Sequence, residues 1–565
     1  MGIVSAMSTR FHYKHPLAFT AVFLTAGVVL HPVEIAATSL FLFLFVAVKF
    51  LCLREAVLAC GALLIGCVSV SQQMKKYTNA QQLVQLSSGI QVYIKSKISY
   101  GSQSKVIAEL RSCLIDDKWY PTDNYTIYWY QKKSKSLTSG TLVAIKGASF
   151  KVPVKPDYSY NFDGAAYALG GKKLGMLDNR KASVFRLESD STSWEFMREC
   201  VKNNILLRIN RILDPRASSL FSGLILGDKS GIDIVDKDNF RKAGLMHILS
   251  VSGMHLGLIY WLLSWPLQRL AKRNRRLQSL EVLLLPILWT YAFITGMAPP
   301  VFRAAAFISI FIGSRIFLKR NIRLTDLLAS TACIYALFDP LSIYSVSFQL
   351  SFAAMIGIAF WFPLWQERLS GYLKKSRYLS DLVGMSLCCT LCTLPLTLYH
   401  FHAIPTWFLV GNLIFTLPFT AIIYLFIGLS ISVYVPVQIV TELLASLSNF
   451  VVDGLYEMLD WGAFFPLPFI YAYDFTFLDG CFFAGVIYAW WRLISQISTF
   501  NFNHIGFVVL SWMIYGIFRS PDFSSPGEAL SRKNLLKYDF QEMGKWAQSH
   551  KIDTLYIDDI RIGKE

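Results

Sequence analysis

The chain has 565 residues and a composition that excludes an ordinary soluble domain. Hydrophobic residues make up 54% of it and charged residues only 16%, whereas soluble domains carry about 25% charged residues. The formal net charge of +17 favours anionic partners. A helical span needs about 20 apolar residues, and residues 73–245 and 519–565 are too polar to cross, so we expect about ten spans.

Residues 1–72 are predicted to form three N-terminal transmembrane helices, near 16–30, 36–53 and 56–71. No small-residue cleavage site follows the first apolar run, so we interpret it as an anchor rather than a secretory signal. Arg10 and Lys14 precede the first span, and short basic segments stay in the cytoplasm. The N-terminus is therefore predicted to be cytoplasmic and residues 73–245 extracytoplasmic, in a multi-pass protein of the bacterial inner (plasma) membrane.

Residues 73–200 have the pattern of a small β domain. Segments at 91–96, 125–131 and 140–147 alternate polar and apolar residues, with polar turns between them. About 100 residues suffice for a five-stranded barrel of the OB type, a fold that often binds single-stranded nucleic acid. The predicted fold class is a polytopic α-helical membrane protein with an inserted small β-barrel (OB-like) extracytoplasmic domain.

The β domain is also basic. Residues 73–200 contain 19 Lys and Arg against 11 Asp and Glu, and retention in the cytoplasm does not explain basic residues on the outer side. Aromatic rings interleave with them and serve either base stacking or the packing of the domain, the commoner use. Only Cys113 and Cys200 lie in this region, so no disulfide framework is predicted. The candidate nucleic-acid contacts are Lys95, Lys97, Lys132, Lys133, Lys146 and Lys151.

Residues 201–245 are predicted to form amphipathic or interfacial helices, and residues 246–518 a transmembrane channel domain followed by a short soluble tail at 519–565. The domain begins near Met246, and its further spans are predicted at 279–297, 299–318, 325–338, 346–366, 379–399, 406–433, 437–452, 476–497 and 503–518. Three clusters of Lys and Arg, at 269–276, 319–323 and 374–377, are separated by even numbers of spans. One orientation therefore fits all three clusters.

The segment 240–258 concentrates polar residues at the mouth of an apolar span. We call 247–255 the Ser-His segment. Each unpaired polar group in a bilayer costs several kcal/mol, so such a segment persists where it packs on protein or lines a wet cavity. A broken helix here would present backbone N–H groups to an anion. Serine beside histidine also offers a nucleophile and a base. The candidate residues are His247, Ser250, Ser252, Gly253 and His255.

Three further polar residues lie inside apolar runs. Arg303 should face a wet cavity or a partner, because insertion of Arg at mid-span costs about 2.5–3.5 kcal/mol. Two interpretations are open: a phosphate contact, or an interfacial arginine whose charged end reaches the headgroups. Gln349 and Ser351 need hydrogen-bond partners, which either a pore or helix-to-helix bonding supplies.

Several motifs, in order, resemble the ComEC family of bacterial competence proteins. The first are Leu224-Ile-Leu-Gly-Asp-Lys-Ser-Gly231, Phe240-Arg-Lys-Ala-Gly-Leu-Met-His247 and Ile248-Leu-Ser-Val-Ser-Gly-Met-His-Leu-Gly-Leu258. Next come Gly296-Met-Ala-Pro-Pro-Val-Phe-Arg-Ala-Ala305 and Asp339-Pro-Leu-Ser-Ile-Tyr-Ser-Val-Ser-Phe-Gln-Leu-Ser-Phe352. The family has "LAVSGLH" where this chain has residues 249–255 with Ser250 and Met254. The resemblance covers roughly residues 20–500.

The resemblance implies a channel that passes single-stranded DNA through the inner membrane during natural transformation. On that interpretation the Ser-His segment, Arg303, Gln349 and Ser351 serve translocation. Within the first motif, Asp228 would repel phosphate, so we assign it a capping or pairing role with Lys229 or Arg241. Asp228, Gly227 and Gly244 are thus predicted to be structural.

Many relatives in the family carry a C-terminal metallo-β-lactamase-type domain, and this chain is expected to be the form that lacks it. The 47 residues after 518 hold one histidine, His550, and His400 with His402 lacks the Asp-His that would complete the signature. We therefore predict no metal, no cofactor and no nuclease activity. Expected partners are single-stranded DNA, the lipid bilayer, other competence proteins, a cytoplasmic motor and a separate nuclease. The alternatives are a small-solute transporter and an intramembrane serine hydrolase.

Overall fold

The computed structural model describes residues 53–496 and two short strands, β11 (Thr554–Ile557) and β12 (Ile560–Gly563). Within 53–496 it leaves out 101–102, 133–139, 152–167, 179–182, 190–193, 250, 274, 318–322, 369–376, 436, 463–468, 473–474 and 476. The spans predicted at 16–30 and 503–518, nearly all of 36–53, and Lys133 and Ser250 lie outside the described residues. So does most of the predicted tail.

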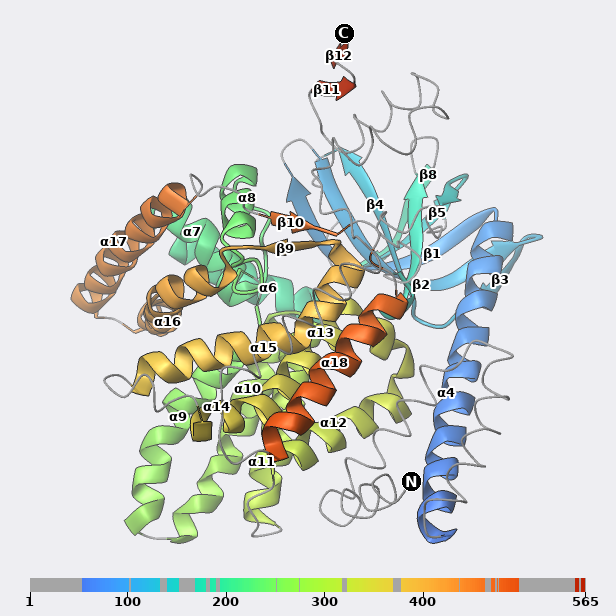
Figure 1. Cartoon of the computed structure of the whole chain (residues 1–565). Helices are drawn as coiled ribbons and strands as arrows, with labels where there is room; N and C mark the ends of the chain where they lie inside the picture. The colour runs from blue at the N-terminus through green and yellow to red at the C-terminus, as the bar shows by residue number, and fades with distance from the viewer. Residues whose placement is uncertain are drawn as a thin grey trace.

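A long helix leads from the third predicted span to the β domain. Helix α4 (Leu53–Leu86) runs along one side of the molecule and ends beside the sheet (Figure 1). The strands are β1 (Gly89–Tyr100), β2 (Gln103–Ile115), β3 (Lys118–Pro121), β4 (Thr126–Lys132), β5 (Thr141–Lys146), β6 (Ser149–Lys151), β7 (Lys173–Asp178) and β8 (Ser183–Ser189). Their order is β6-β7-β4-β2-β1-β5-β8, with β3 on β2. The predicted β domain is therefore present.

The closed OB-like barrel is not confirmed, because the described strands form an open sheet. Its order ends at β6 on one side and β8 on the other, and no pairing among the described strands joins them. The reason is visible in the core, where Tyr77, Ala80 and Val84 of α4 pack against the strands. A helix thus covers the apolar face that a barrel would cover with strands. Trp129 and Tyr125 are buried in this core, whereas Trp119 and Tyr120 are exposed.

The sheet nevertheless curls. Strand β5 ends at Lys146 and β6 begins at Ser149, yet the two strands belong to opposite sides of the sheet order. Three residues of chain reach at most about 11 Å, so the two sides of the sheet approach each other at this link. We call residues 146–151 the seam.

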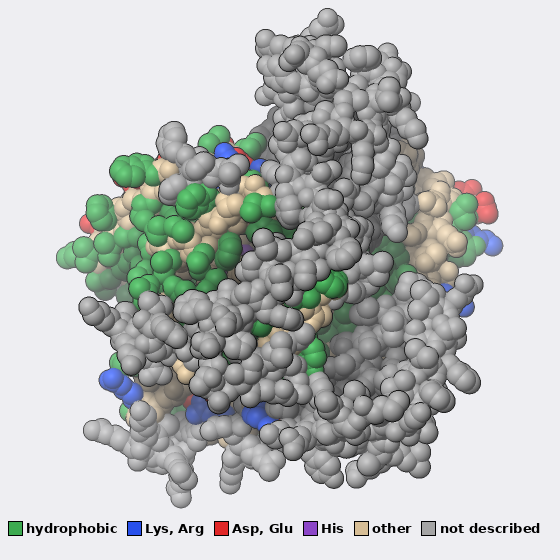
Figure 2. All heavy atoms as spheres, in the orientation of Figure 1, with side chains coloured by type: hydrophobic (Ala, Val, Ile, Leu, Met, Phe, Trp, Pro, Cys, Tyr) green, Lys and Arg blue, Asp and Glu red, His purple; other side chains and the backbone are tan. Residues whose placement is uncertain are grey.

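Five helical segments are long and apolar enough to cross a membrane, as judged over the described residues alone. They are Pro299–Ile316, Val346–Glu367, Leu379–Phe401, Phe408–Ser432 and Gln438–Trp461, which agree with five of the predicted spans. These helices are the basis for a multi-pass helical membrane protein. Hydrophobic side chains crowd the surface over α16 and α17 (Figure 2), including Ile439, Phe450 and Trp461, each at least three-quarters exposed. This apolar surface is suited to lipid contact.

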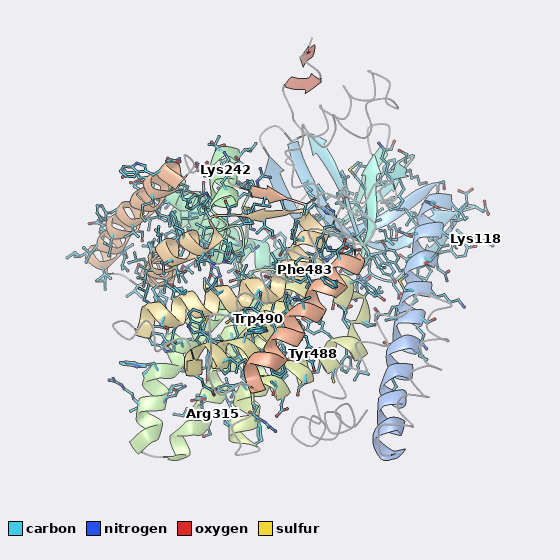
Figure 3. All side chains as sticks on the ribbon, in the orientation of Figure 1. Lys118, Lys242, Arg315, Phe483, Tyr488 and Trp490 are labelled. Atoms are coloured by element: carbon cyan, nitrogen blue, oxygen red, sulfur yellow. The ribbon has the colours of Figure 1, made fainter. Side chains whose placement is uncertain are left out.

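The helices of this region are α9 (Gly253–Arg273), α10 (Leu284–Ile294), α11 (Pro299–Ile316), α12 (Leu324–Phe338), α13 (Val346–Ile356), α14 (Phe362–Arg368), α15 (Arg377–Phe401), α16 (Phe408–Ser432), α17 (Gln438–Gly462) and α18 (Phe477–Gln496). Short turns η2 (Arg275–Leu283), η3 (Pro340–Tyr344) and η4 (Gly357–Trp361) join them, and β9 (Ala403–Pro405) pairs with β10 (Phe469–Tyr471). Trp490 of α18 packs on Trp361, 4.9 Å between ring centroids (Figure 3). Lys242 and Arg315 lie at opposite ends of the view in Figure 3.

The segment predicted as interfacial helices shares one core with α16 and α17. It comprises α6 (Trp194–Ile209), α7 (Pro215–Phe221), the π-helical η1 (Ser222–Leu226) and α8 (Ile234–Lys242). Ring pairs Phe221 with Phe426 and Phe240 with Phe419 lie 5.2 and 5.8 Å apart. At the far end of α16, Arg208 donates to the Val433 carbonyl at 3.4 Å. No break in packing therefore separates residues 209–249 from these two helices.

The β domain is attached to the start of α13. Leu341 of η3 is buried in the core of the β domain, and Lys172 forms an ion pair with Asp339 at 2.8 Å. A Cβ atom on Gly170 would lie 2.5 Å from the Ser345 backbone, so only glycine allows this approach. The sheet is held directly above the first turn of α13 by these contacts.

The two cysteines within residues 73–200 should differ in reactivity. Cys113 is buried, and burial raises the pKa of its thiol to about 11, whereas Cys200 is exposed. A maleimide should modify Cys200 at pH 8 and leave Cys113 unmodified until the domain unfolds, because thiolate is the reactive form. Mass spectrometry of peptides from the purified protein measures this. Equal labelling of both cysteines in the folded protein would contradict the buried position of Cys113.

Candidate functional site

The Ser-His segment caps the start of α9. The backbone N–H of Ser252 donates to His255 Nδ1 at 3.1 Å, and Ser252 Oγ lies 3.0 Å from the same nitrogen. Because α9 begins at Gly253, Ser252 is the N-cap residue and His255 the third helical residue, the arrangement of a capping box. A nitrogen that accepts a backbone N–H carries no proton, so the proton of the neutral ring lies on Nε2. His255 is fully buried, and its Nε2 has no partner among the described residues.

His247 serves a different element. Its Nδ1 lies 3.0 Å from the Gly244 carbonyl, so the ring folds back on the turn that ends α8. His247 and His255 therefore do not act as one pair on the Ser252 hydroxyl. Among the described residues, no group of three or more His, Cys, Asp and Glu side chains is placed to hold a metal ion.

Three glycines allow the segments around the site to approach closely. Gly244 is left-handed (φ 73°), and a Cβ atom there would lie 2.8 Å from Phe408 Cα at the start of α16. Gly227, also left-handed (φ 78°), ends η1 beside Val251. Gly253 faces the Ala304 methyl group of α11 at a Cβ distance of 3.3 Å. The glycines thus bring η1, α9, α11 and α16 to one place.

Asp228 has a local structural contact, as its predicted role requires. Its Oδ1 accepts the backbone N–H of Ser230 at 2.9 Å, which closes the turn after η1. Arg241, one of the predicted partners, instead pairs with Asp238 at 2.8 Å.

Arg303 lies inside the helix bundle and only 5% of it is exposed. Its Nη2 donates to the Ser347 carbonyl at 2.8 Å and contacts Ser347 Oγ at 3.0 Å, in the first turn of α13. The guanidinium also lies 5.8 Å from the centre of the Phe348 ring. An arginine whose charged end reaches the lipid headgroups would be exposed at that end. This geometry therefore argues against the interpretation of Arg303 as an interfacial arginine.

Gln349 links three elements. Its Nε2 donates to the Ile343 carbonyl at 3.2 Å, and its Oε1 lies 2.7 Å from His400 Nε2 of α15. Helical geometry places Ser351 about 200° around α13 from Gln349, so the two do not share a face. In the sequence, His400 fits only part of a metal signature. Its position as a polar residue at the end of an apolar run is the signal for a contact such as that with Gln349.

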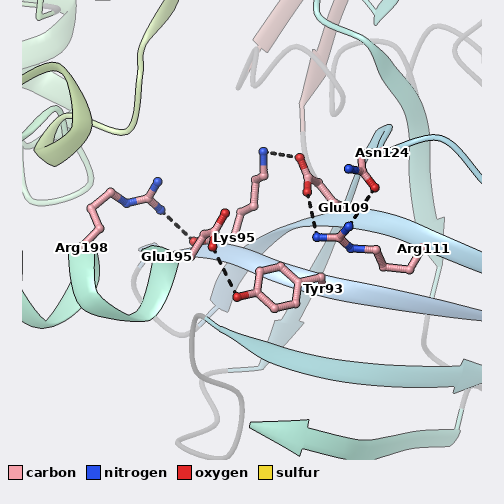
Figure 4. Close-up of polar contacts among 7 residues, drawn as sticks. All are labelled: Tyr93, Lys95, Glu109, Arg111, Asn124, Glu195 and Arg198. Carbon is pink, nitrogen blue, oxygen red and sulfur yellow. Dashed lines mark hydrogen bonds and ion pairs between the residues drawn. The ribbon is translucent and has the colours of Figure 1, made fainter. Parts of the chain in front are cut away.

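The candidate lysines whose side chains are described lie at two places in the β domain, at Lys95 and at the seam. Lys95 pairs with Glu109, and Arg111 lies 3.6 Å from the same carboxylate (Figure 4). Helix α6 covers this face, since Arg198 donates to the Lys95 carbonyl at 2.8 Å. Lys97 and Lys132 belong to β1 and β4. Lys146 and Lys151 are exposed at the seam.

The candidate site lies within a stretch of the chain that matches a known protein family. A family model described as "Competence protein" matches residues 224–496, from η1 through the Ser-His segment, Arg303 and Gln349 to the end of α18. Residues 224–496 belong to the competence protein family. This competence domain therefore contains every predicted translocation residue, while the β domain lies before it.

Three curated relatives match parts of the chain at low identity. ComE operon protein 3 of Bacillus subtilis (strain 168) is 27% identical over 214 residues, which are 38% of this chain and 26% of that protein. An uncharacterized protein of Aquifex aeolicus (strain VF5) is 28% identical over 201 residues, 34% of this chain and 46% of that protein. The uncharacterized protein YcaI of Escherichia coli (strain K12) is 26% identical over 204 residues, 35% of this chain and 26% of that protein. The chain thus spans less than half the length of these relatives, and no solved structure matches it significantly.

The surroundings of Gly244 and Gly257 predict that substitution by alanine changes the stability of the protein differently at the two positions. Gly244→Ala should lower the free energy of unfolding by at least the roughly 1–2 kcal/mol of left-handed strain, because its methyl group also meets Phe408. Gly257→Ala is the control: no atom lies within 4 Å of its Cβ position, so it should be neutral or stabilise α9 by about 0.5–1 kcal/mol. Thermal unfolding in detergent compares the two. Equal midpoints would show that the Gly244 turn does not need glycine.

Proposed function

We propose that this chain is a channel of the bacterial inner membrane that takes up single-stranded DNA during natural transformation. The observation that carries the proposal is the competence-domain match over the helices that hold Arg303 and Gln349. A relative of that domain is named for the ComE operon. Residues of this chain then bind and guide the strand, and cleavage and energy input are assigned to other proteins, a nuclease and a cytoplasmic motor.

The path of the strand would begin at the β domain. DNA phosphates attract Lys and Arg over distances set by ionic strength, and Lys146 and Lys151 are exposed at the seam. The β domain rests on the start of α13 through Gly170 and Lys172. A strand that leaves the sheet therefore meets Ser347 and Arg303 next, and the Ser-His segment beyond Ala304.

The proposal also places residues 73–245 outside the cell membrane and the N-terminus in the cytoplasm. Arg315 lies near the predicted cytoplasmic end of its span, at the opposite end of the view from Lys242 of the segment proposed to lie outside (Figure 3). The contact of Arg208 with Val433 puts the turn between α16 and α17 on the same side as the end of α6. One crossing each by α15 and α16 from the predicted cytoplasmic cluster 374–377 would instead put that turn in the cytoplasm. With residues 73–245 outside, these two helices therefore do not both cross the membrane.

A labelling experiment tests this placement. Two variants, each with a single cysteine, carry Cys200 or Tyr434→Cys, and both positions are exposed. An impermeant maleimide added to intact spheroplasts should label both, because α6 and the turn at 434 share the outer side. Labelling of neither position until the cells are opened would overturn the proposed orientation. Labelling of Cys200 alone would put the turn at 434, and with it the end of α6 at Arg208, on the other side of the membrane from Cys200.

Deletion of the gene in a transformable host is the decisive test of function. Uptake of labelled DNA into the cytoplasm should fall to background and return with the wild-type gene on a plasmid. Attachment of DNA to the cell surface should continue, because the proposal assigns entry, not capture, to this chain. Normal cytoplasmic entry in the deletion strain would remove the DNA role.

The contact of Ser252 Oγ with His255 Nδ1 favours a second candidate, an intramembrane serine hydrolase. Against it, the same nitrogen also accepts the Ser252 backbone N–H, and no described carboxylate orients Nε2. These features are those of a helix cap. A serine-reactive fluorophosphonate that labels Ser252 in the purified protein would favour the hydrolase over the channel.

A further inference from the structure

Helix α11 carries two arginines with contrasting environments. Near its inner end, Arg315 lies 3.1 Å from the carboxylate of Glu281, which is 1% exposed. Arg303, three turns earlier, is more deeply buried than Arg315, but no carboxylate among the described residues forms an ion pair with it. Its Nε is buried and has no hydrogen-bond partner there. A buried charge normally has a partner of opposite sign. Arg315 has one in Glu281, and Arg303 lacks one among the described residues.

The first turn of α13, which Arg303 contacts, adds further positive charge beside the unpaired guanidinium. The first turn of α13 carries the positive end of the helix dipole. Ser345 caps it by accepting the N–H of Phe348 on its hydroxyl at 3.2 Å and that of Gln349 on its carbonyl at 3.1 Å. Val346 and Ser347 are the first two residues of α13, so their N–H groups have no acceptor within the helix. A cation at this end of a helix is repelled rather than stabilised.

We propose that Arg303 and the first turn of α13 form a phosphate-binding site. An anion there would accept from Arg303 Nε, from the free amides of Val346 and Ser347, and from Ser347 Oγ. Donors that converge from a guanidinium and a helix N-terminus suit an anion with several oxygen atoms. The site opens toward Ser347, which is exposed.

The site lies where the two parts of the protein meet. Gly170 of the β domain touches Ser345, the cap of the same turn, and Lys172 is paired beside it with Asp339. On the other side, Ala304 follows Arg303 in sequence and faces Gly253 of the Ser-His segment. The identification of a DNA phosphodiester as the natural occupant rests on the proposed function. The binding of a phosphate group rests on this geometry alone.

Inorganic phosphate is the first probe, with the full chain purified in detergent. At constant ionic strength, phosphate should raise the unfolding midpoint of the wild-type protein more than chloride does. Arg303→Gln should weaken the apparent affinity for phosphate at least tenfold. Arg303→Lys, which keeps the charge and loses the forked donors, should give an intermediate value and serves if the glutamine variant does not fold.

The matched control removes the other arginine together with its partner. The double variant Arg315→Gln, Glu281→Gln changes the same helix without leaving a buried charge unpaired, and it should keep the full phosphate effect. An equal phosphate effect in the Arg303→Gln variant, or none beyond that of chloride in the wild type, would overturn the site.

The source of the phosphate is decided by competition. A thymidine oligonucleotide that displaces phosphate from the wild type, and not from Arg303→Gln, supports a DNA occupant. Displacement by an anionic phospholipid alone keeps the phosphate site and overturns DNA as its occupant. Neither result depends on uptake by cells, so failure here is distinguishable from failure of the channel proposal.

Discussion

The structure depends on how polar helix ends are satisfied within an apolar bundle. Away from water, unpaired N–H and C=O groups cost several kcal/mol, so each broken helix needs a cap. The Ser252 and His255 pair caps α9, and Ser345 caps α13. Asp228 closes the turn after η1. The polar residues that distinguish this membrane region are therefore placed where helices begin and end.

Close approach is the second requirement of this arrangement. Gly244, Gly253 and Gly170 stand where backbones meet within the reach of a single methyl group. They hold η1, α9, α11 and α16 together and fix the β domain to the first turn of α13. A methyl group added at these positions would meet backbone atoms or another methyl group rather than a flexible side chain. The surrounding structure can therefore relax little, and the substitution should destabilise the packing.

Two buried polar atoms bear on the proposed function. His255 Nε2 and Arg303 Nε are both buried without a partner in the described part of the chain. The first belongs to a helix cap, and the second lies at the positive end of another helix. A conduit for a polyanion needs fixed cations that do not pair with protein carboxylates, and Arg303 meets this condition whereas Arg315 does not.

The sequence by itself determined the local features. Hydropathy predicted the five described helices that are long and apolar enough to cross a membrane, because the apolar length of a span is a property of consecutive residues. Alternation predicted β1, β4 and β5 of the eight-stranded sheet, and the ordered motifs identified the competence domain. The helix caps could partly be predicted from the sequence, because Asp228 and Ser252 each form a hydrogen bond with a residue two or three positions away.

Only the tertiary structure decided which distant residues meet. Arg303 finds Ser347 across 44 positions and Gln349 finds His400 across 51, and periodicity carries no information about such partners. The sheet remained open because α4 supplied the missing cover, and residues 209–249 joined the core of α16 and α17. These outcomes depend on the competition among apolar faces for burial, which the whole chain settles together.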